Sequence, residues 1–443
     1  MRAGVVWLAV VACGGCWSSD PLVDGAFTPP QWAALQKEFR LPVPPDPCAI
    51  AGLRRPACDA ALGLAKQLFS DRSLSGNGAV SCETCHDAPR AWIDVRVPAN
   101  ISASSASATG WTKRNAMTLL NLGYKPRGQH VFTWSGEYTT AGQVLDLAVV
   151  KAMGSNVANV AAVVRNSSAY SAAYTTAFEG PPPADDAMLF LQLEQAFDGY
   201  LSEFATGASP FDHYLDGEPT ALSDSQKRGF AVFVGRGGCS ECHSGPLLSD
   251  LQLHNTGVPQ ASTQAGPPVP TRDPGRADIT TAPADNGKFL TGSLREIAST
   301  GPYMHDGRYD SLVEVIGFYR GGGGGGDFPE NHDPRVQPLE ISDDEAQDLE
   351  AFLGALSECD ATTCPDHHAP HDAGVVADAP GPVADAPSPW SDGALPDAPS
   401  CLPPLQTCGT PPMCRAVQTD SNNCGTCGHV CFSYQMCLAG TCM

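Results

Sequence analysis

The sequence predicts a mainly α-helical chain with two similarly organised domains, followed by a disordered linker and a small disulfide-rich module. Three observations predict this architecture. The same motif, Cys-x-x-Cys-His, begins at Cys82 and again at Cys239. Apolar residues recur at helical spacing around both motifs. After Cys364 the composition turns to Ala, Asp, Pro and Ser, and eight cysteines crowd residues 401–442.

The first residues have the pattern of an export signal. Arg2 precedes an apolar run from Val5 to Ala12, and small residues follow, so we predict a signal peptide over residues 1–19. Val10-Val11-Ala12-Cys13 resembles a bacterial lipobox, which would place a lipid on Cys13 and tether the protein to a membrane. An ordinary cleaved signal is the alternative. In both cases the expected location is the periplasm or the cell envelope.

The cysteine content fits an exported protein. Eighteen cysteines are too many for a reducing cytosol, where disulfides do not persist. Cys48 with Cys58 and Cys359 with Cys364 form close pairs that suggest disulfides. The connectivity of the last eight cysteines cannot be read from their spacing.

Charge and composition limit the classes of partner. The formal net charge is -22 and the pI is about 4.7, so nucleic acid and anionic membranes would be repelled. The hydrophobic fraction of 42% is sufficient for globular cores. No stretch after the signal reaches the roughly 20 apolar residues that a spanning helix needs. Contact with a membrane is therefore expected only through a lipid on Cys13.

The chain after the signal divides by composition. Residues 20–46 are a Pro-rich arm, and the first domain is expected over 47–220, where Pro and Gly residues mark a boundary. The second domain is expected over 221–358. An Asp, Ala and Pro linker over 359–400 cannot bury a core. The Cys-rich module over 401–443 would depend on disulfides.

Three helices are predicted in the second domain. The first begins at the capping residue Ser223 and ends at Gly237-Gly238. The second covers 311–320, and the third covers 343–357. Tyr319 shares the apolar face of the second helix with Leu312, Val315 and Ile316, so its side chain is expected to point inward.

The repeated motif predicts covalent haem attachment. Two thiols three residues apart form the thioether bonds of haem c, and the adjacent histidine ligates the iron. The predicted attachment residues are Cys82, Cys85 and His86 for one haem and Cys239, Cys242 and His243 for the other. Zinc would need four thiolates at one ion, whereas these pairs lie in separate predicted domains. The fold class is therefore two cytochrome c-like haem domains.

Longer stretches around the motifs resemble the bacterial diheme cytochrome c peroxidases and the related MauG-type enzymes. The resemblance is carried by five stretches within about residues 47–357: Leu68 to Gly76, Arg114-Asn115 to Leu119, Asp278 to Phe289, Ser293-Leu294-Arg295, and Gly301-Pro-Tyr-Met-His-Asp-Gly307. It does not cover the tail, whose Cys-rich module resembles small repeats of myxobacterial surface proteins.

The resemblance implies different roles for the two haems. The haem on His86 is expected to react with hydrogen peroxide. Residues 87–113 contain no histidine, so this iron is expected to have an open sixth site, as in MauG-type enzymes. An unpredicted ligand such as Met117 or His130 is the alternative. The haem on His243 is expected to take Tyr319 as its second ligand, where peroxidases place methionine.

Three further residues match functional positions of the family. Trp134 corresponds to the tryptophan between the haems, which relays electrons. Gln143 corresponds to a glutamine that follows it, and Asn115 resembles a residue that helps bind calcium, which prefers oxygen ligands. We therefore expect two covalent haem c groups and a calcium ion as cofactors.

The sequence also departs from the family after Trp134. Ser135-Gly136-Glu137 stands where Asp-Gly-Arg is usual, Leu147 replaces a proline, and Ala152 replaces the glutamate that moves a proton between the peroxide oxygens. Glu137 and Lys151 are the candidates to substitute for that glutamate.

The predicted function is that of a diheme peroxidase or MauG-like oxidoreductase. It would react with hydrogen peroxide at the first haem and take electrons through the second from a small cytochrome, a cupredoxin or a side chain of a partner protein. A diheme electron-transfer cytochrome without peroxidase activity is the alternative.

Overall fold

The computed structural model describes residues 22–94, 114–259 and 273–358, and the backbone of four short strands near the end of the chain. Two antiparallel pairs are formed by these strands, β3 (Gln406–Cys408) with β4 (Met413–Arg415) and β5 (Cys437–Leu438) with β6 (Thr441–Cys442). They belong to a compact unit separate from the one that contains both Cys-x-x-Cys-His motifs. The predicted signal, Cys13, the linker and the side chains of the Cys-rich module lie outside the described residues.

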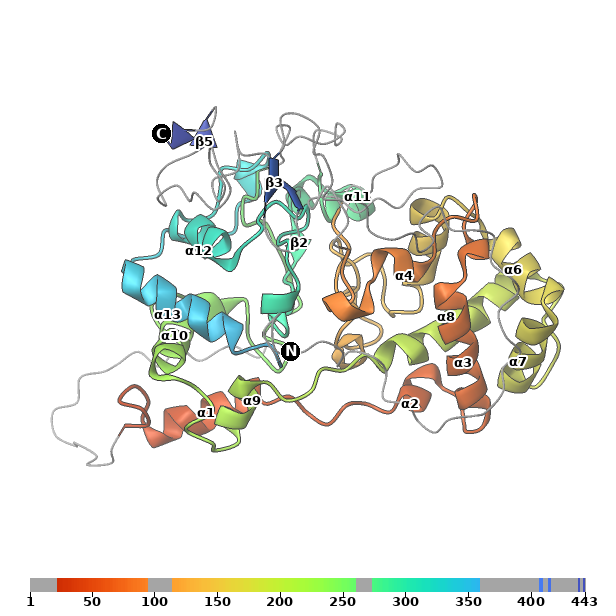
Figure 1. The fold of residues 1–443 in the computed structure, drawn as a ribbon, viewed down its shortest axis with the longest axis horizontal. Coiled ribbons are helices and arrows are strands. Elements are labelled where there is room, and N and C mark those ends of the chain that lie inside the picture. Colours follow the sequence, from red (N-terminus) through yellow and green to blue (C-terminus); the bar gives the residue numbers. More distant parts are fainter. Residues whose placement is uncertain are drawn as a thin grey trace. The chain divides into compact units, whose positions relative to one another are not determined.

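The described residues between 22 and 358 are mainly helical, as predicted (Figure 1). The one strand pair described there is β1 (Leu253–His254) with β2 (Phe289–Leu290). No single helix in the described ranges is long and apolar enough to cross a membrane.

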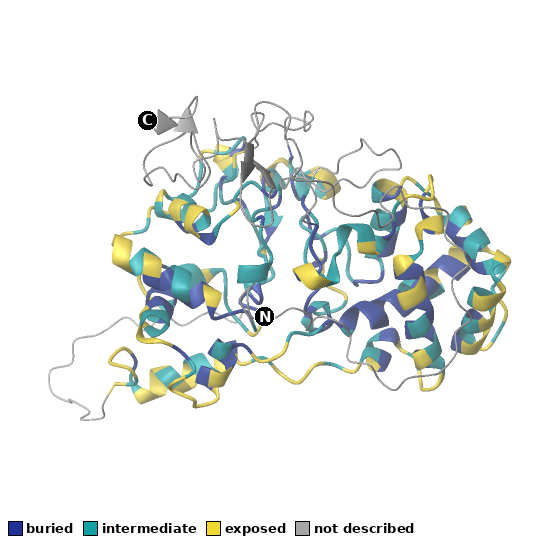
Figure 2. Cartoon of the chain, viewed as in Figure 1, coloured by how far each residue is buried: buried dark blue, intermediate teal, exposed yellow. Residues whose placement is uncertain are grey.

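The first hydrophobic core is built by five helices that pack on α3 and on the long helix α8. The group comprises α2 (Pro47–Ala51), α3 (Ala57–Ser70), α6 (Val157–Asn166), α7 (Ser168–Phe178) and α8 (Asp186–Ser202). On α3, Ala61, Leu64, Ala65 and Leu68 are buried, at the spacing of one helix face. Figure 2 shows the buried stripes of α3 and α8.

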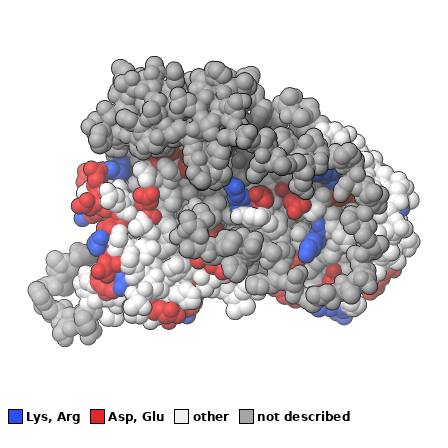
Figure 3. Space-filling model, in the orientation of Figure 1, with Lys and Arg blue, Asp and Glu red and all other residues white. Residues whose placement is uncertain are grey.

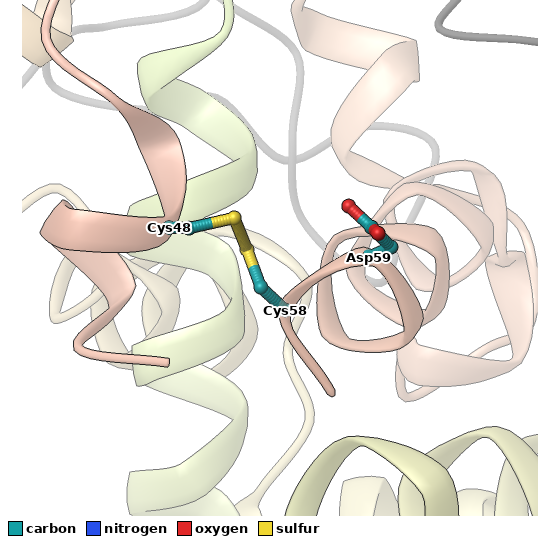
Figure 4. A group of neighbouring side chains, drawn as sticks. All are labelled: Cys48, Cys58 and Asp59. Carbon is teal, nitrogen blue, oxygen red and sulfur yellow. A yellow bond between two sulfur atoms is a disulfide. The ribbon is translucent and has the colours of Figure 1, made fainter. Parts of the chain in front are cut away.

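A disulfide ties α2 to α3 at the edge of this core. It joins Cys48 and Cys58, which are both buried (Figure 4). Asp59 lies close to the two sulfur atoms. Because the sulfur atoms are bonded to each other, this group of side chains is not a metal site.

The second core contains helices from both ends of the described chain. They are α1 (Pro29–Phe39), α9 (Pro210–Leu215), α10 (Asp224–Val234), α12 (Leu312–Arg320) and α13 (Asp343–Gly354). Helices α10 and α13 approach closely, since a Cβ atom added at Gly229 would overlap the carbonyl oxygen of Asp348. The arm predicted over 20–46 thus contains a helix that packs on the second core through Phe39, and α9 packs there although it precedes residue 220.

The predicted helix starts in the second domain agree with the structure. Ser223 and Ser311 each accept a hydrogen bond from the third residue of their helix in a capping box. Helix α13 begins at Asp343 as predicted and ends at Gly354, a few residues earlier than expected. Leu349, Phe352 and Leu353 form its buried side.

Short elements connect these helices and carry the predicted site. They are the α-helical turns α4 (Cys82–Cys85), α5 (Val144–Asp146) and α11 (Ala277–Thr280), a π-helical turn η4 (Leu147–Ala152), and the 3₁₀ turns η1 (Arg72–Leu74), η2 (Ala88–Arg90), η3 (Leu122–Tyr124), η5 (Cys239–Glu241), η6 (Pro283–Asp285), η7 (Ile297–Ser299) and η8 (Pro329–Asn331).

Candidate haem sites and the residues between them

The first motif forms one helical turn. Helix α4 contains both cysteines, and His86 is the C-cap residue that follows it. The Nδ1 atom of His86 lies 2.9 Å from the carbonyl oxygen of Trp92. A proton on Nδ1 leaves Nε2 as the atom able to bind iron, which is how backbone carbonyls usually orient a histidine ligand.

The second motif has the same arrangement. Cys239 begins the turn η5 after Gly238, whose φ of 61° suits glycine. The Nδ1 atom of His243 lies 3.0 Å from the carbonyl oxygen of Leu248. Burial lowers the pKa of His243, which favours the neutral ring that binds iron.

The four motif cysteines are not in disulfides. Burial raises the pKa of Cys82 and of Cys239 to about 12, and that of Cys242 to about 11. These groups are therefore thiols at neutral pH. A zinc site would need the thiol groups gathered around one ion, and among the described residues the four motif cysteines do not form such a group.

A cavity of about 310 Å³ adjoins the second motif. Its walls include Cys239, Cys242, His243 and, from α12, Tyr319. Tyr319 points inward as predicted, together with Leu312, Val315 and Ile316. Burial raises the pKa of the Tyr319 phenol to about 12, and a hydrogen bond with the Thr256 side chain partly offsets this. The phenol and the motif histidine therefore share one cavity.

His254 also lines this cavity, but its ring nitrogens already have partners. Nδ1 lies 2.8 Å from a carboxylate oxygen of Asp333, and Nε2 lies 2.9 Å from one of Asp250. Arg335 contacts both Asp333 and the His254 ring. His254 is thus held as a hydrogen-bonding residue beside Cys242 rather than as an iron ligand.

Trp134 joins the two parts of the haem region. Its indole Nε1 donates to the carbonyl oxygen of Asn115 at 2.9 Å, and its carbonyl oxygen accepts from Leu290 of β2 at 2.8 Å. Asn115 in turn donates from its backbone N to the His305 carbonyl oxygen at 2.7 Å and from Nδ2 to the Pro302 carbonyl oxygen at 3.1 Å. The residue predicted to relay electrons therefore lies on a direct hydrogen-bonded connection between the segment after the first motif and the segments after the second motif.

A charged cluster reinforces the same junction. Arg114 donates to both carboxylate oxygens of Asp273 at 2.7 and 2.8 Å, and it also pairs with Asp278 at 3.0 Å. Its guanidinium carbon lies 5.5 Å from the centroid of the Phe289 ring, which stacks on His305. This arrangement fixes the segment that begins with Arg114 against the second domain.

Gln143 lies on the segment after Trp134, together with the residues at which this chain differs from the family. The Gln143 side-chain oxygen accepts from the backbone N and the hydroxyl of Thr139, both at 3.0 Å. Lys151 Nζ lies 3.3 Å from a carboxylate oxygen of Glu137. Lys151 is part of the turn η4, next to Ala152. Such π-helical turns are frequent at functional sites.

The two alternative ligands for the first haem lie in different places. Met117 lines the cavity that contains His243. His130 has its Nδ1 atom 3.2 Å from the Glu137 carbonyl oxygen. Most of the segment 87–113, in which no histidine occurs, lies outside the described residues.

Sequence reasoning did not identify the carbonyl groups that orient the motif histidines. Trp92 and Leu248 both have positive φ values, 59° and 48°, which turn their carbonyl groups toward the histidines. Thr256, the partner of Tyr319, was also missed. Its position after β1 carried no motif of its own.

Comparisons with known proteins agree with this geometry. The family model for di-haem cytochrome c peroxidase matches residues 59–220. Cytochrome-c peroxidase IdrP1 of Pseudomonas sp. (strain SCT) is 32% identical over 73% of this chain and 88% of its own length. The methylamine utilization protein MauG of Methylophilus methylotrophus is 30% identical over 66% of this chain and 81% of its own length.

A solved structure is also similar. The crystal structure of a MauG-like protein associated with microbial copper homeostasis superposes with a TM-score of 0.57 at 28% identity, over 72% of this chain and 93% of that one. The family implies haem c cofactors, and the four thiols, the two oriented histidines and the cavity beside His243 fit them. By its close relatives and its motifs, the chain belongs to the di-haem cytochrome c peroxidase and MauG family of peroxidase-type oxidoreductases.

Proposed function

We propose that this protein reduces hydrogen peroxide at the haem attached to Cys82, Cys85 and His86, and receives electrons through the haem attached to Cys239, Cys242 and His243. The observation that carries the division of labour is the inward-facing Tyr319, which shares a cavity with His243. After the first motif, residues 87–113 contain no histidine that could act as a second ligand to its haem. A haem bound at His86 would thereby keep an open site for peroxide, whereas a haem bound at His243 would have Tyr319 as a second ligand.

The bound haem supplies the redox chemistry that cleaves the peroxide O–O bond. The protein must supply the proton transfer. Glu137 is our candidate for this role, because its carboxylate is held by Lys151 next to the position of Ala152, and only 20% of its side chain is exposed. Gln143 supports the same segment through Thr139. Trp134 provides the path between the domains.

The side-chain oxygen of Asn115 supports a calcium site at the junction. This oxygen is buried and has no hydrogen-bond partner among the described residues. The amide nitrogen of the same side chain donates to the Pro302 carbonyl oxygen. A buried carbonyl-type oxygen of this kind suits calcium. Dialysis against a calcium-selective chelator should change the haem spectrum, and added calcium should restore it. A spectrum insensitive to both treatments would contradict this site.

The electron donor is proposed to be a neutral or basic small cytochrome or cupredoxin, or a side chain of a partner protein. The net charge of -22 supports this choice, and Figure 3 shows acidic side chains distributed over the face drawn, with fewer basic ones. Residues 1–19 support export to the periplasm or envelope, with Cys13 as the lipidation site. Loss of membrane association in a Cys13→Ala variant would support the lipid anchor, and unchanged fractionation would oppose it.

The decisive activity assay is peroxide consumption by the holoprotein with a reduced small cytochrome. Turnover supports the peroxidase. The alternative, a diheme electron carrier, is favoured by Ala152, since the family glutamate is missing there. Rapid electron exchange with the cytochrome but no peroxide consumption would establish that alternative.

A further inference from the structure

Trp92 and Leu248 perform the same backbone task at the two haem motifs. Each has a left-handed backbone, and each uses its carbonyl oxygen to accept the Nδ1–H group of a motif histidine. Both side chains are buried, with Trp92 5% and Leu248 0% exposed. The backbone task therefore does not explain why an indole stands at one site and an aliphatic chain at the other.

The Trp92 ring belongs to a compact group of aromatic side chains from α3, from the C-terminal end of α8 and from the residues just after α8. It stacks on Phe204 with ring centroids 4.1 Å apart and an interplanar angle of 10°. Phe69 approaches it edge-on at 5.8 Å, and Phe204 lies 5.0 Å from Tyr200. Such stacked and edge contacts make a compact aromatic cluster beside the His86 motif.

The indole N–H group of Trp92 is unusual within this cluster. It is buried and has no hydrogen-bond acceptor among the described residues. Trp134, by contrast, donates its N–H group to Asn115. Leaving a buried donor unpaired costs about 1–3 kcal/mol. A phenylalanine would keep the ring contacts with Phe69 and Phe204 without that cost, so ring packing alone does not account for the tryptophan.

We propose that Trp92 is a redox-active residue that supplies one electron to the haem held by His86 after peroxide has oxidised that haem. The proposal rests on the assignment of the peroxide reaction to the His86 haem. The connection from the indole to the iron ligand is short, because the Trp92 carbonyl oxygen is hydrogen-bonded to the ligand ring itself. Phe204 provides a π face on which the positive charge of the oxidised indole is stabilised.

The electrons and protons of this step balance. Reduction of one hydrogen peroxide to two waters takes two electrons and two protons. Trp92 would lend one electron and the bound haem the other, the protons would come from solvent, and the external donor would return both electrons. The indole then becomes a radical cation. It keeps its N–H proton, because no acceptor is available among the described residues. An electron from the external donor, arriving through the second haem, restores the indole, so Trp92 is not consumed.

The test uses the full-length holoprotein and the variants Trp92→Phe and Trp92→Leu. The second variant copies the residue found at the equivalent place beside His243. Trp32→Phe is the matched control, since Trp32 packs against Phe27, Tyr214 and Phe230 in the other core. Resting haem spectra first establish that His86 ligation is unchanged. Each protein then receives stoichiometric peroxide without donor, and the haem absorption change is recorded.

Two readouts follow. Freeze-quench electron paramagnetic resonance, with ring-deuterated tryptophan, detects an indole radical, and peptide mass spectrometry locates oxidised tryptophan. We expect a radical and oxidation at residue 92 in the unmodified protein and in Trp32→Phe, and their loss in both Trp92 variants. A normal haem response without any Trp92 radical or oxidation would overturn this inference alone. A haem that does not respond to peroxide would overturn the proposed function and the inference with it.

Discussion

Arg295 holds three separate segments together near the second haem motif. Its Nη1 atom lies 2.7 and 2.6 Å from the carboxylate oxygens of Asp212, its Nη2 donates to the Phe39 carbonyl oxygen at 2.8 Å, and its Nε donates to the Pro246 carbonyl oxygen at 2.9 Å. Only 1% of the Arg295 side chain is exposed. Because Pro246 lies between His243 and the carbonyl that orients it, Arg295 also supports the haem site.

The substitution Arg295→Met would leave the Asp212 carboxylate without its cation and two carbonyl groups without their donor. Removing one partner of a buried ion pair costs about 3–5 kcal/mol. The hydrogen bonds that Ser209 donates to Asp212 remain, so we expect the lower end, about 3 kcal/mol. In a domain of roughly 150–250 residues, 1 kcal/mol corresponds to about 2–4 °C, so that loss lowers the melting temperature by roughly 6–12 °C.

The control is Arg228→Met. Arg228 makes a similar two-point contact with Asp348, at 2.7 and 2.8 Å, but 62% of its side chain is exposed. The Asp348 side chain is only 11% exposed, but water already solvates the Arg228 head group and screens the pair, so this variant should lose clearly less stability than Arg295→Met. Thermal unfolding of the holoproteins, followed by circular dichroism and by haem absorption, compares the two. Equal losses of stability would refute the reasoning from burial.

The remaining predictions address the second haem, a buried carboxyl group, the disulfide and the proton donor. In Tyr319→Met the potential of one haem should rise, because an anionic oxygen ligand is lost; an unchanged redox titration would contradict the ligand assignment. Burial raises the pKa of Glu296 to about 7 from 4.5, so the folded state retains a proton that the unfolded state loses, and the free energy of unfolding should fall as pH rises through that range. Denaturant titrations at several pH values should show that the free energy of unfolding depends less on pH in Glu296→Gln. An unchanged pH dependence would exclude Glu296 as its source. Cys58→Ser opens a loop of sequence separation 10 and should cost about 3 kcal/mol in the same titrations, whereas a loss near zero would mean that the bond does not form. In Glu137→Gln, peroxide consumption should slow by about 10²–10⁴-fold; wild-type rates and pH dependence would assign proton transfer elsewhere.

Two helix starts were predictable, and the motif that predicts haem attachment could be recognised, because both depend on contiguous sequence. Covalent haem attachment needs two cysteines and a histidine in one short segment, so the motif at Cys82 can be recognised without knowledge of the fold. Ser223 and Ser311 cap their own helices through residues three positions ahead. Tyr319 was placed correctly because helical periodicity determines which side faces inward.

The rest depends on contacts between distant segments. The pairing of Arg114 with Asp273 joins residues 159 positions apart, and nothing local distinguishes those charges from other surface charges. The packing of Phe39 onto the second core has the same character. The positive φ of Trp92 was also hidden, because a bulky residue rarely adopts it and composition therefore argues against it.

The most direct test of the account is the absorption and electron paramagnetic resonance spectrum of the oxidised holoprotein, recorded before and after a stoichiometric amount of hydrogen peroxide. The account predicts one high-spin haem with an open site and one low-spin haem, and a change of the high-spin signal when peroxide is added. Two low-spin haems whose spectra do not respond to peroxide would contradict it.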